Sequence, residues 1–122
     1  MPAAILIVED EMLLAMDLED ILVGAGYTVI GSAVDMHQAV AIAERFGNGI
    51  DAAIMDVNLA NGTNGVETAG LLRQGWNIPS LFVSANIDEK MRARASQWNP
   101  IGFVGKPYSE REMLNALKAA FA

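Results

Sequence analysis

The sequence predicts an α/β fold, in which helices on both faces cover a doubly wound parallel sheet of five strands. Two observations predict it. Short apolar runs alternate with amphipathic segments along the whole chain, which is the pattern of successive β-α units. Four of the apolar runs also end on polar or charged residues, and parallel sheets of this type collect functional groups at the carboxyl ends of their strands.

The first half of the chain is expected to fold as strand, helix, strand, helix and strand. The strands are the apolar runs at 3–8, 27–33 and 51–56. The helix expected at 11–24 stops at glycines, and its apolar face consists of Leu14, Leu18, Ile21 and Leu22. The helix expected at 36–46 ends before a Gly-Asn-Gly turn.

The middle of the chain begins with a loop rich in Asn and Gly over 57–65. A short helix follows at 65–74 and is expected to close near Gly75. The fourth strand is the apolar run at 79–84.

The last third of the chain is expected to add helix, strand and helix. The helix at 88–97 begins with an aspartate that can cap it. The fifth strand is the run at 101–104. The final helix, at 109–121, begins with a capping box, because Ser109 is followed three residues later by Glu112.

The composition excludes several classes of protein. The chain has 122 residues, which suits one domain, and 52% of them are hydrophobic, which argues against disorder. The net charge of −7 argues against nonspecific binding to nucleic acid or anionic membranes. The chain has no cysteine, so thiolate chemistry is excluded. Because no apolar run approaches the ~20 residues of a membrane span and no signal peptide begins the chain, we expect a cytoplasmic protein.

The first third of the chain is acidic and carries more apolar side chains than one core face uses. No Lys or Arg occurs before Arg45. Met12, Leu13 and Met16 lie off the apolar stripe of the helix at 11–24. A solvated surface and a docking surface for a basic partner both explain these features, and the sequence leaves the two open.

Three carboxylates are expected to meet at the ends of the first and third strands. Glu9 and Asp10 follow the first apolar run, and Asp56 ends the third. Carboxylates this close repel each other unless a positive charge compensates them. Mg²⁺ is the natural counter-charge, because it prefers oxygen ligands and binds through one or two carboxylates plus a phosphate. The backbone carbonyl of Asn58 can reach the same ion.

Two other strand ends supply donors for a phosphoryl group. Lys106 follows the fifth strand and offers a compact positive charge, and Ser84 ends the fourth strand with a hydroxyl. Carboxylates can be phosphorylated as nucleophiles, and phosphoryl transfer needs mainly positioning and charge neutralisation. Each residue alone is more typical of a simple turn, but together they predict a phosphorylation site at Asp56.

These strand ends resemble the receiver domain of two-component response regulators. The resemblance covers the whole chain and rests on Val8-Glu9-Asp10-Glu11, Met55-Asp56-Val57-Asn58-Leu59, Val83-Ser84-Ala85 and Phe103-Val104-Gly105-Lys106-Pro107. It implies one receiver domain over 1–122, with a flavodoxin-like fold of strand order 2-1-3-4-5. By the family pattern, Asp56 is the phosphoacceptor, Glu9 and Asp10 bind Mg²⁺ together with the Asn58 backbone, and Ser84 and Lys106 contact the phosphoryl group.

The resemblance also implies how the domain would switch. The switch position on the fifth strand is Phe103, which can swing inward but has no hydroxyl to donate. The Lys106-Pro107 bond is expected to be cis. The loop after Asp56 departs from the family pattern, because it lacks the usual proline and is one residue longer.

The leading hypothesis is a single-domain response regulator. A histidine kinase or phosphotransfer protein would phosphorylate Asp56, and the surface of the fourth helix, fifth strand and fifth helix would change for a separate target protein. Such a protein catalyses only its own phosphorylation and dephosphorylation. A phosphorelay intermediate and a phosphate sink are the alternatives.

Two rivals from other classes are disfavoured. A phosphatase of the haloacid dehalogenase type needs a second Asp as general acid, and that position is Asn58 here. A flavodoxin needs a phosphate loop after the first strand, where this chain has acidic residues that would repel a phosphate. His37, the single histidine, is expected to be a surface residue rather than a phosphohistidine.

Overall fold

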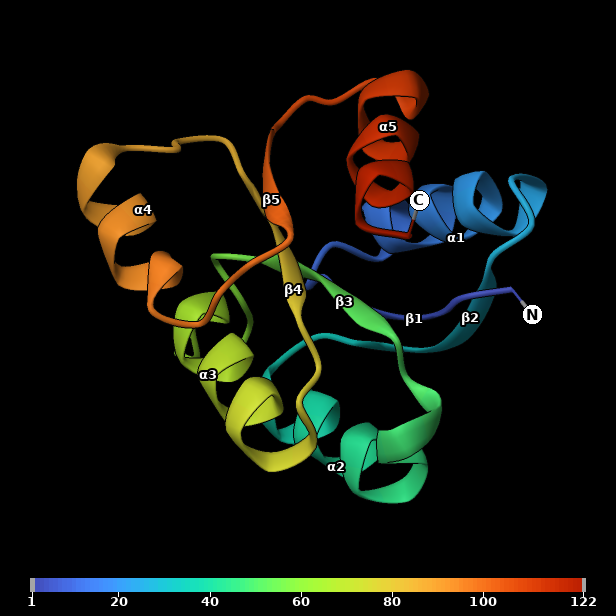
Figure 1. Ribbon diagram of the computed structural model, residues 1–122. Coiled ribbons are helices and arrows are strands. Elements are labelled where there is room, and N and C mark those ends of the chain that lie inside the picture. The colour runs from blue at the N-terminus through green and yellow to red at the C-terminus, as the bar shows by residue number, and fades with distance from the viewer. Residues whose placement is uncertain (1, 122) are drawn as a thin grey trace.

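The computed structural model describes residues 2–121 and contains the expected parallel sheet. Its five strands lie in the order β2-β1-β3-β4-β5 (Figure 1). Their bounds are Ala4–Val8 (β1), Thr28–Ala33 (β2), Ala52–Asp56 (β3), Ser80–Ser84 (β4) and Gly102–Gly105 (β5). All neighbouring strands run parallel. The fold class and the strand order are therefore confirmed.

The helices form a layer on each face of the sheet (Figure 1). One layer contains α1 and α5, and the other contains α2, α3 and α4. The bounds are Met12–Gly24 (α1), Met36–Phe46 (α2), Gly65–Trp76 (α3), Glu89–Ser96 (α4) and Glu110–Phe121 (α5), with a short 3₁₀ turn at Gly47–Gly49 (η1).

The strands divide their side chains between two hydrophobic cores. In β1, Leu6 and Val8 face the core beneath α2, α3 and α4, while Ile5 and Ile7 face the core beneath α1 and α5. Every residue of β1, β3 and β4 is buried. A strand buried on both faces has no polar alternation, which is why these segments are continuous apolar runs in the sequence.

Side-chain caps begin several helices where the sequence predicts them. Asp88 accepts a hydrogen bond from the N–H of Met91 at 2.8 Å. The capping box is also present, because the N–H of Glu112 donates to the Ser109 hydroxyl at 3.1 Å and the N–H of Ser109 donates to the Glu112 carboxylate at 3.2 Å. These bonds satisfy N–H groups that would otherwise have no partner at a helix start.

The helix α3 ends within two residues of the expected close near Gly75. The helix continues to Trp76, and Asn77 ends it in the left-handed conformation with φ of 55°. Asparagine tolerates this conformation because its short polar side chain bonds locally. The stop signal is therefore Asn77.

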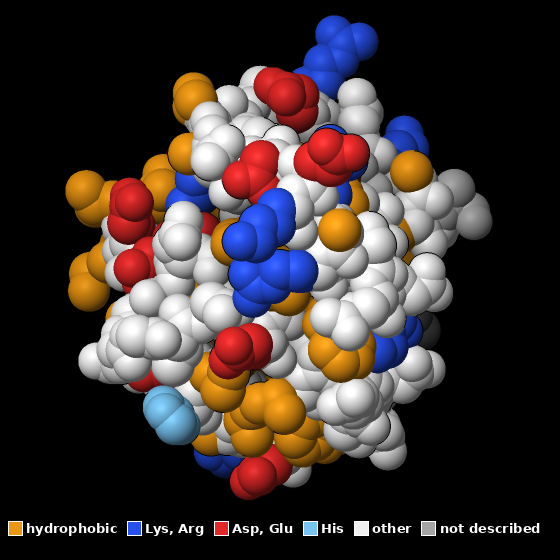
Figure 2. Space-filling model, turned by 90° about the vertical axis from the view of Figure 1, so that its left-hand side faces the viewer, with side chains coloured by type: hydrophobic (Ala, Val, Ile, Leu, Met, Phe, Trp, Pro, Cys, Tyr) orange, Lys and Arg blue, Asp and Glu red, His pale blue; other side chains and the backbone are white. Residues whose placement is uncertain are grey.

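The helix α4 is weakly attached to the core, because beyond its two buried residues no hydrophobic side chain of the helix packs against it. It buries two side chains, Met91 and Ala95, and its remaining residues are exposed. Seen from the side on which α4 lies, the molecule presents a group of Lys and Arg side chains near its centre (Figure 2).

The segment after α4 is fastened to α3. The Trp98 ring packs against Gly70, where an added Cβ would lie 2.6 Å from a ring carbon. Arg73 donates from Nε to the Trp98 carbonyl at 3.0 Å and from Nη2 to the Asn99 carbonyl at 2.6 Å. These contacts fix the C-terminal end of α4.

Among residues 2–121, none of the helices has the length and apolar character needed to cross a membrane.

Candidate phosphorylation and metal site

The carboxyl ends of the strands bring the predicted site residues to one edge of the sheet. Val8 pairs with Met55, so the residues that follow them, Glu9 and Asp56, lie side by side. Ser84 pairs with Gly105, the residue before Lys106. The gathering of these groups follows directly from the parallel registers.

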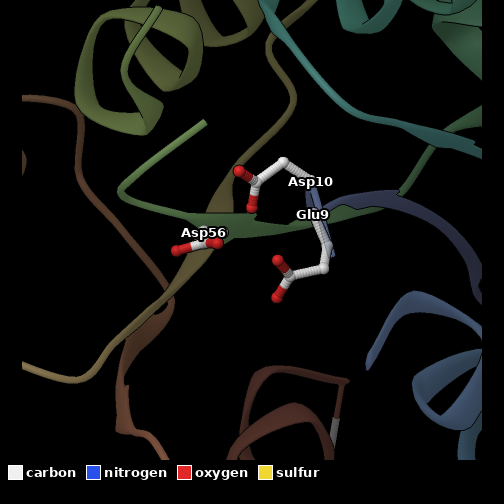
Figure 3. A group of neighbouring side chains, drawn as sticks. All are labelled: Glu9, Asp10 and Asp56. Carbon is white, nitrogen blue, oxygen red and sulfur yellow. The ribbon is translucent and has the colours of Figure 1, made fainter. Parts of the chain in front are cut away.

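Three carboxylates form the centre of the site (Figure 3). Glu9, Asp10 and Asp56 each offer an oxygen, and the three oxygens lie within 4.8 Å of one another. Glu9 and Asp56 are each 5% exposed, while Asp10 is exposed. An all-oxygen set with one solvent-facing member fits a hard cation such as Mg²⁺, which keeps several of its waters.

Lys106 compensates the two buried carboxylates. Its Nζ lies 2.8 Å from Glu9 Oε1 and 3.2 Å from Asp56 Oδ2. Burial works to lower the pKa of the Lys106 ammonium, but the bonds to Glu9 and Asp56 outweigh it, and the pKa is raised above its ordinary value. Lys106 therefore stays charged at neutral pH.

Glu9 is the carboxyl group most affected by this environment. Burial, followed by the proximity of Asp56, raises the pKa of Glu9, although Lys106 and the N–H of Glu11 oppose the change. The N–H of Glu11 donates to Glu9 Oε2 at 3.1 Å. A second positive charge at this site would favour the ionised form of Glu9.

Asn58 lies against Asp56 through its backbone amide. The N–H of Asn58 donates to Asp56 Oδ1 at 3.2 Å. The Asp56 carboxylate is thus held from two sides, by this amide and by Lys106.

Ser84 is buried at the end of β4, but its hydroxyl bonds within its own loop. Ser84 Oγ accepts from the N–H of Asn86 at 3.1 Å and donates to the Asn86 carbonyl at 3.3 Å. A cleft of about 280 Å³ lies beside it, bordered by Asn58, Ser84 and Met91. Ser84 would have to turn away from Asn86 to contact a phosphoryl group.

Phe103 lies on the face of the sheet that carries α4. Its ring stacks on Phe82 with centroids 5.7 Å apart, and the Arg92 guanidinium from α4 lies 4.7 Å from the ring centroid. The Lys106-Pro107 bond is cis, as expected.

Residues outside the site also match their expected places. His37 is exposed in the first turn of α2. Met12, Leu13 and Met16 are 74%, 80% and 56% exposed, so they are not part of the core.

Sequence reasoning missed two features near the site. One is the ion pair of Lys106 with Glu9, which is shorter than its contact with Asp56. The other is a contact between the loop after Asp56 and the start of α2, where Asn61 Nδ2 donates to Asp35 Oδ2 at 2.6 Å. The Asn61-Gly62 pair indicates an ordered turn, but no local sequence pattern shows that Asn61 bonds to Asp35.

A family model described as the response regulator receiver domain matches residues 5–118. The phyllosphere-induced regulator PhyR of Methylorubrum extorquens is 32% identical over 88% of this chain and 39% of its own length. The transcriptional regulatory protein PdtaR of Mycobacterium tuberculosis is 30% identical over 98% of this chain and 57% of its own length. The chain therefore spans less than two-thirds of these curated relatives.

The signal receiver domain of a modulated diguanylate cyclase from Desulfovibrio desulfuricans has a similar structure. Its TM-score is 0.88 and its sequence identity 32%, and the match covers 98% of this chain and 94% of the other.

Proposed function

This chain belongs to the response regulator receiver domain family, and we propose that it is a single-domain response regulator phosphorylated on Asp56. The observation that carries the proposal is the Asp56 carboxylate, held within a cluster of Glu9, Asp10 and Lys106. A receiver domain is not a conventional enzyme, so the chemistry is its own phosphorylation and dephosphorylation.

In the proposed reaction, an Asp56 oxygen attacks the phosphorus of a phosphohistidine. The new O–P bond forms as the N–P bond to the donor imidazole breaks, and the imidazole leaves with the bonding electrons. The donor is a histidine kinase or a histidine phosphotransfer protein. Lys106 stabilises the added negative charge, and Ser84, once turned away from Asn86, donates to a phosphoryl oxygen.

We assign the metal ligands to Glu9, Asp10 and Asp56, with the Asn58 backbone carbonyl as a further ligand. Bound Mg²⁺ would neutralise negative charge on the phosphoryl oxygens. The oxygen-only donor set and the exposure of Asp10 support this assignment.

The proposed output is a change at the surface of α4, β5 and α5. Ser84 moves to the phosphoryl group, and Phe103 fills the space beneath α4. The loose attachment of α4 and the position of Phe103 beside Arg92 support this route. A downstream protein would read the altered surface.

The proposed docking surface for the phosphodonor is α1. Its exposed Met12, Leu13 and Met16 lie on an acidic helix, and a cavity of about 380 Å³ bordered by Glu9, Met12 and Met16 links them to the site. Methionine suits an adaptable partner surface, and the acidic side chains favour a basic partner. The proposal places the protein in the cytoplasm, where such kinases would phosphorylate it.

Treatment with acetyl phosphate and Mg²⁺ tests the assignment of Asp56. Intact-mass spectrometry should detect one added phosphoryl group on the wild type and none on Asp56→Asn. A stable adduct on Ser84 or His37 would contradict the proposal. Transfer onward to a phosphotransfer protein would indicate a relay intermediate, and phosphorylation without any binding partner would indicate a phosphate sink.

A further inference from the structure

The loop between β3 and α3, residues 57–64, is held from within only by a short antiparallel bridge between Asn58 and Asn64 and by a turn between Ala60 and Thr63. It has no proline. At its tip, Asn61 and Gly62 have positive φ values of 59° and 72°. Asn and Gly adopt these values readily, but they also leave a chain free to adopt others. The loop carries Asn58, which contacts Asp56, so contacts that tie its tip to another element bear on the order of the site.

Those contacts come from the corner between β2 and α2. The N–H of Ala60 donates to the Val34 carbonyl at 3.1 Å. Asn61 Nδ2 donates to Asp35 Oδ2 at 2.6 Å. The second bond joins an amide to a carboxylate, which makes it stronger than a bond between neutral groups.

Thr63 adds a third link at the far side of the loop. Its hydroxyl accepts from the N–H of Met36 at 3.3 Å and donates to the Ala60 carbonyl at 2.9 Å. The loop is therefore attached to the α2 corner on both sides of its tip.

Asp35 is itself firmly held. Its side chain is buried, and its other oxygen accepts from the N–H of Gln38 at 2.9 Å, which caps α2. The bonds from Gln38 and Asn61 hold the pKa of Asp35 below its ordinary value, so the carboxylate stays ionised at neutral pH. Asp35 cannot release Asn61 by rotating unless it also uncaps the helix.

Both ends of the loop lie directly on Asp56. At one end, the N–H of Asn58 donates to Asp56 Oδ1 at 3.2 Å. At the other end, an added Cβ on Gly65 would lie 2.0 Å from the Asp56 carbonyl oxygen. A displacement of the loop therefore moves groups that touch Asp56.

We propose that Asp35 and Asn61 are positioning residues for the phosphorylation of Asp56. Their bond holds loop 57–64 in the one arrangement that keeps Asn58 against the acceptor. The inference rests on the proposed function, because it takes Asp56 as the phosphoacceptor and Asn58 as a metal-binding position.

Asn61→Asp tests the bond, because it keeps the size and backbone preference of the residue but turns the donor into a carboxylate facing Asp35. Phosphorylation by acetyl phosphate and the affinity for Mg²⁺ should each fall by at least about fivefold, the value of one ordinary hydrogen bond. In metal-free protein, the Ala60 amide should exchange its hydrogen faster, which reports on the loop independently of phosphorylation.

The double variant Asp35→Asn, Asn61→Asp restores a bond with donor and acceptor exchanged. Asn at position 35 can still accept from Gln38 while its amide donates to the new carboxylate. The phosphorylation rate, the Mg²⁺ affinity and the exchange of Ala60 should return to within about twofold of wild type, because the hydrogen bond is regained. Failure of the double variant to recover would show that the bond is not the cause.

Asn48→Asp is the matched control, because it adds the same charge at an exposed position in η1. It should behave as wild type. If circular dichroism shows that Asn61→Asp is unfolded, Asn61→Gly is used instead, because it removes the amide without adding charge. It should lower the phosphorylation rate and the Mg²⁺ affinity and speed the hydrogen exchange of Ala60.

The two proposals fail in different ways. If the wild type is phosphorylated on Asp56 and both Asn61 variants match it in rate and Mg²⁺ affinity, the positioning role is wrong and the proposed function stands. If the wild type is not phosphorylated on Asp56, the proposed function is wrong, and Mg²⁺ affinity and hydrogen exchange still decide whether the bond orders the loop.

Discussion

Lys106 is the residue that allows buried carboxylates to share one edge of the sheet. It bonds Glu9 at 2.8 Å and Asp56 at 3.2 Å. Removing one partner of a buried charge cluster leaves the others uncompensated, which is strongly destabilising. In the absence of a metal ion, Lys106 therefore acts as the counter-ion of the site.

Lys106→Ala should make the protein depend on Mg²⁺ for stability. Because the ion replaces the lost positive charge, Mg²⁺ should raise the unfolding temperature more in the variant than in the wild type. The variant should also accept a phosphoryl group more slowly and fail to signal, because a charge-assisted contact is worth about 1.5–3 kcal/mol. Thermal unfolding with and without Mg²⁺ measures the first effect.

Lys118→Ala is the control for this experiment, since Lys118 is exposed on α5. It should respond to Mg²⁺ as the wild type does. An equal response of Lys106→Ala and the wild type, or full signalling by Lys106→Ala, would show that another group neutralises the site.

At the scale of elements, α4 is anchored unequally at its two ends. Its C-terminal end is fixed by Trp98 on Gly70 and by the two bonds from Arg73. Its N-terminal end borders the cleft beside Ser84. A movement of α4 driven from Ser84 is therefore expected to pivot about the Trp98 end.

Gly70→Ala should loosen that pivot. The new Cβ would lie 2.6 Å from the Trp98 ring, so the indole has to move. Overpacking of this kind costs about 1–3 kcal/mol. Urea unfolding should detect the loss, and in a Trp76→Phe background the fluorescence of Trp98 should change.

Gly75→Ala is the matched control within the same helix. An added Cβ there meets nothing within 4 Å, and alanine favours a helix over glycine by about 1 kcal/mol. This variant should be more stable than the wild type. Equal stability of the Gly70 and Gly75 variants would contradict the close packing of Trp98.

Asp35 makes the stability of α2 and its loop dependent on pH. Backbone bonding by Gln38, together with the Asn61 side chain, lowers the pKa of Asp35 below its ordinary value of 3.8. A lowered pKa in the folded state stabilises the protein above the unfolded value, and that stability is lost as the pH falls through the folded value.

Asp35→Asn should therefore be less stable than the wild type at neutral pH, and the difference should shrink as the pH falls below 3.8. Asparagine still caps the helix, so the comparison isolates the charge. Urea unfolding at several pH values measures it. If the stability difference between Asp35→Asn and the wild type does not change with pH, the Asp35 carboxylate is not its source.

The sequence located the first residues of helices better than it located the residues that end them. Asp88 and the Ser109–Glu112 box cap their helices as predicted, because a cap bonds to backbone only a few residues away. The end of α3 was placed within two residues, but the residue that turns the chain is Asn77 rather than Gly75, because Asn77 adopts the left-handed conformation. Local side-chain chemistry was therefore sufficient to predict the N-terminal caps, but it did not decide between Gly75 and Asn77 as the residue that ends α3.

At the scale of the whole molecule, phosphorylation should shift the balance between two packings around β4 and β5. Beryllofluoride with Mg²⁺, as a phosphoryl mimic, should perturb the amide signals of 84–86, of 88–98 and of Phe103. A ligand shifts such a balance only through contacts that favour one state. The Ser84 hydroxyl, now bonded to Asn86, is the group expected to make that contact.

Nuclear magnetic resonance of the amide groups measures this response. The amide signals of α1 and of most of α2 should change much less than those of α4. Asp35 and Met36 are excluded from this comparison, because they contact the loop after Asp56. If the largest changes away from Asp56 lie along α2, the proposed coupling from Ser84 to Phe103 is wrong.

The sequence predicted which side chains gather at this edge of the sheet, because sheet topology alone brings strand ends together. Glu9, Asp10, Asp56, Ser84 and Lys106 needed only a parallel sheet to become neighbours. It could not predict the bond from Asn61 to Asp35 or the turn of Ser84 toward Asn86. Those depend on side-chain rotamers and on contacts between loops, which leave no periodic pattern in a sequence.

The separation of the two hydrophobic cores by the sheet has a further consequence, for how the sequence can evolve. Leu18 of α1 and Leu72 of α3 belong to different cores and share no core neighbours. Destabilisation by Leu18→Ala and Leu72→Ala should therefore add within about 0.5 kcal/mol in the double variant. Mutations in the core of one helical layer should then leave the packing of the other layer almost unaffected, so the two layers can change independently of each other.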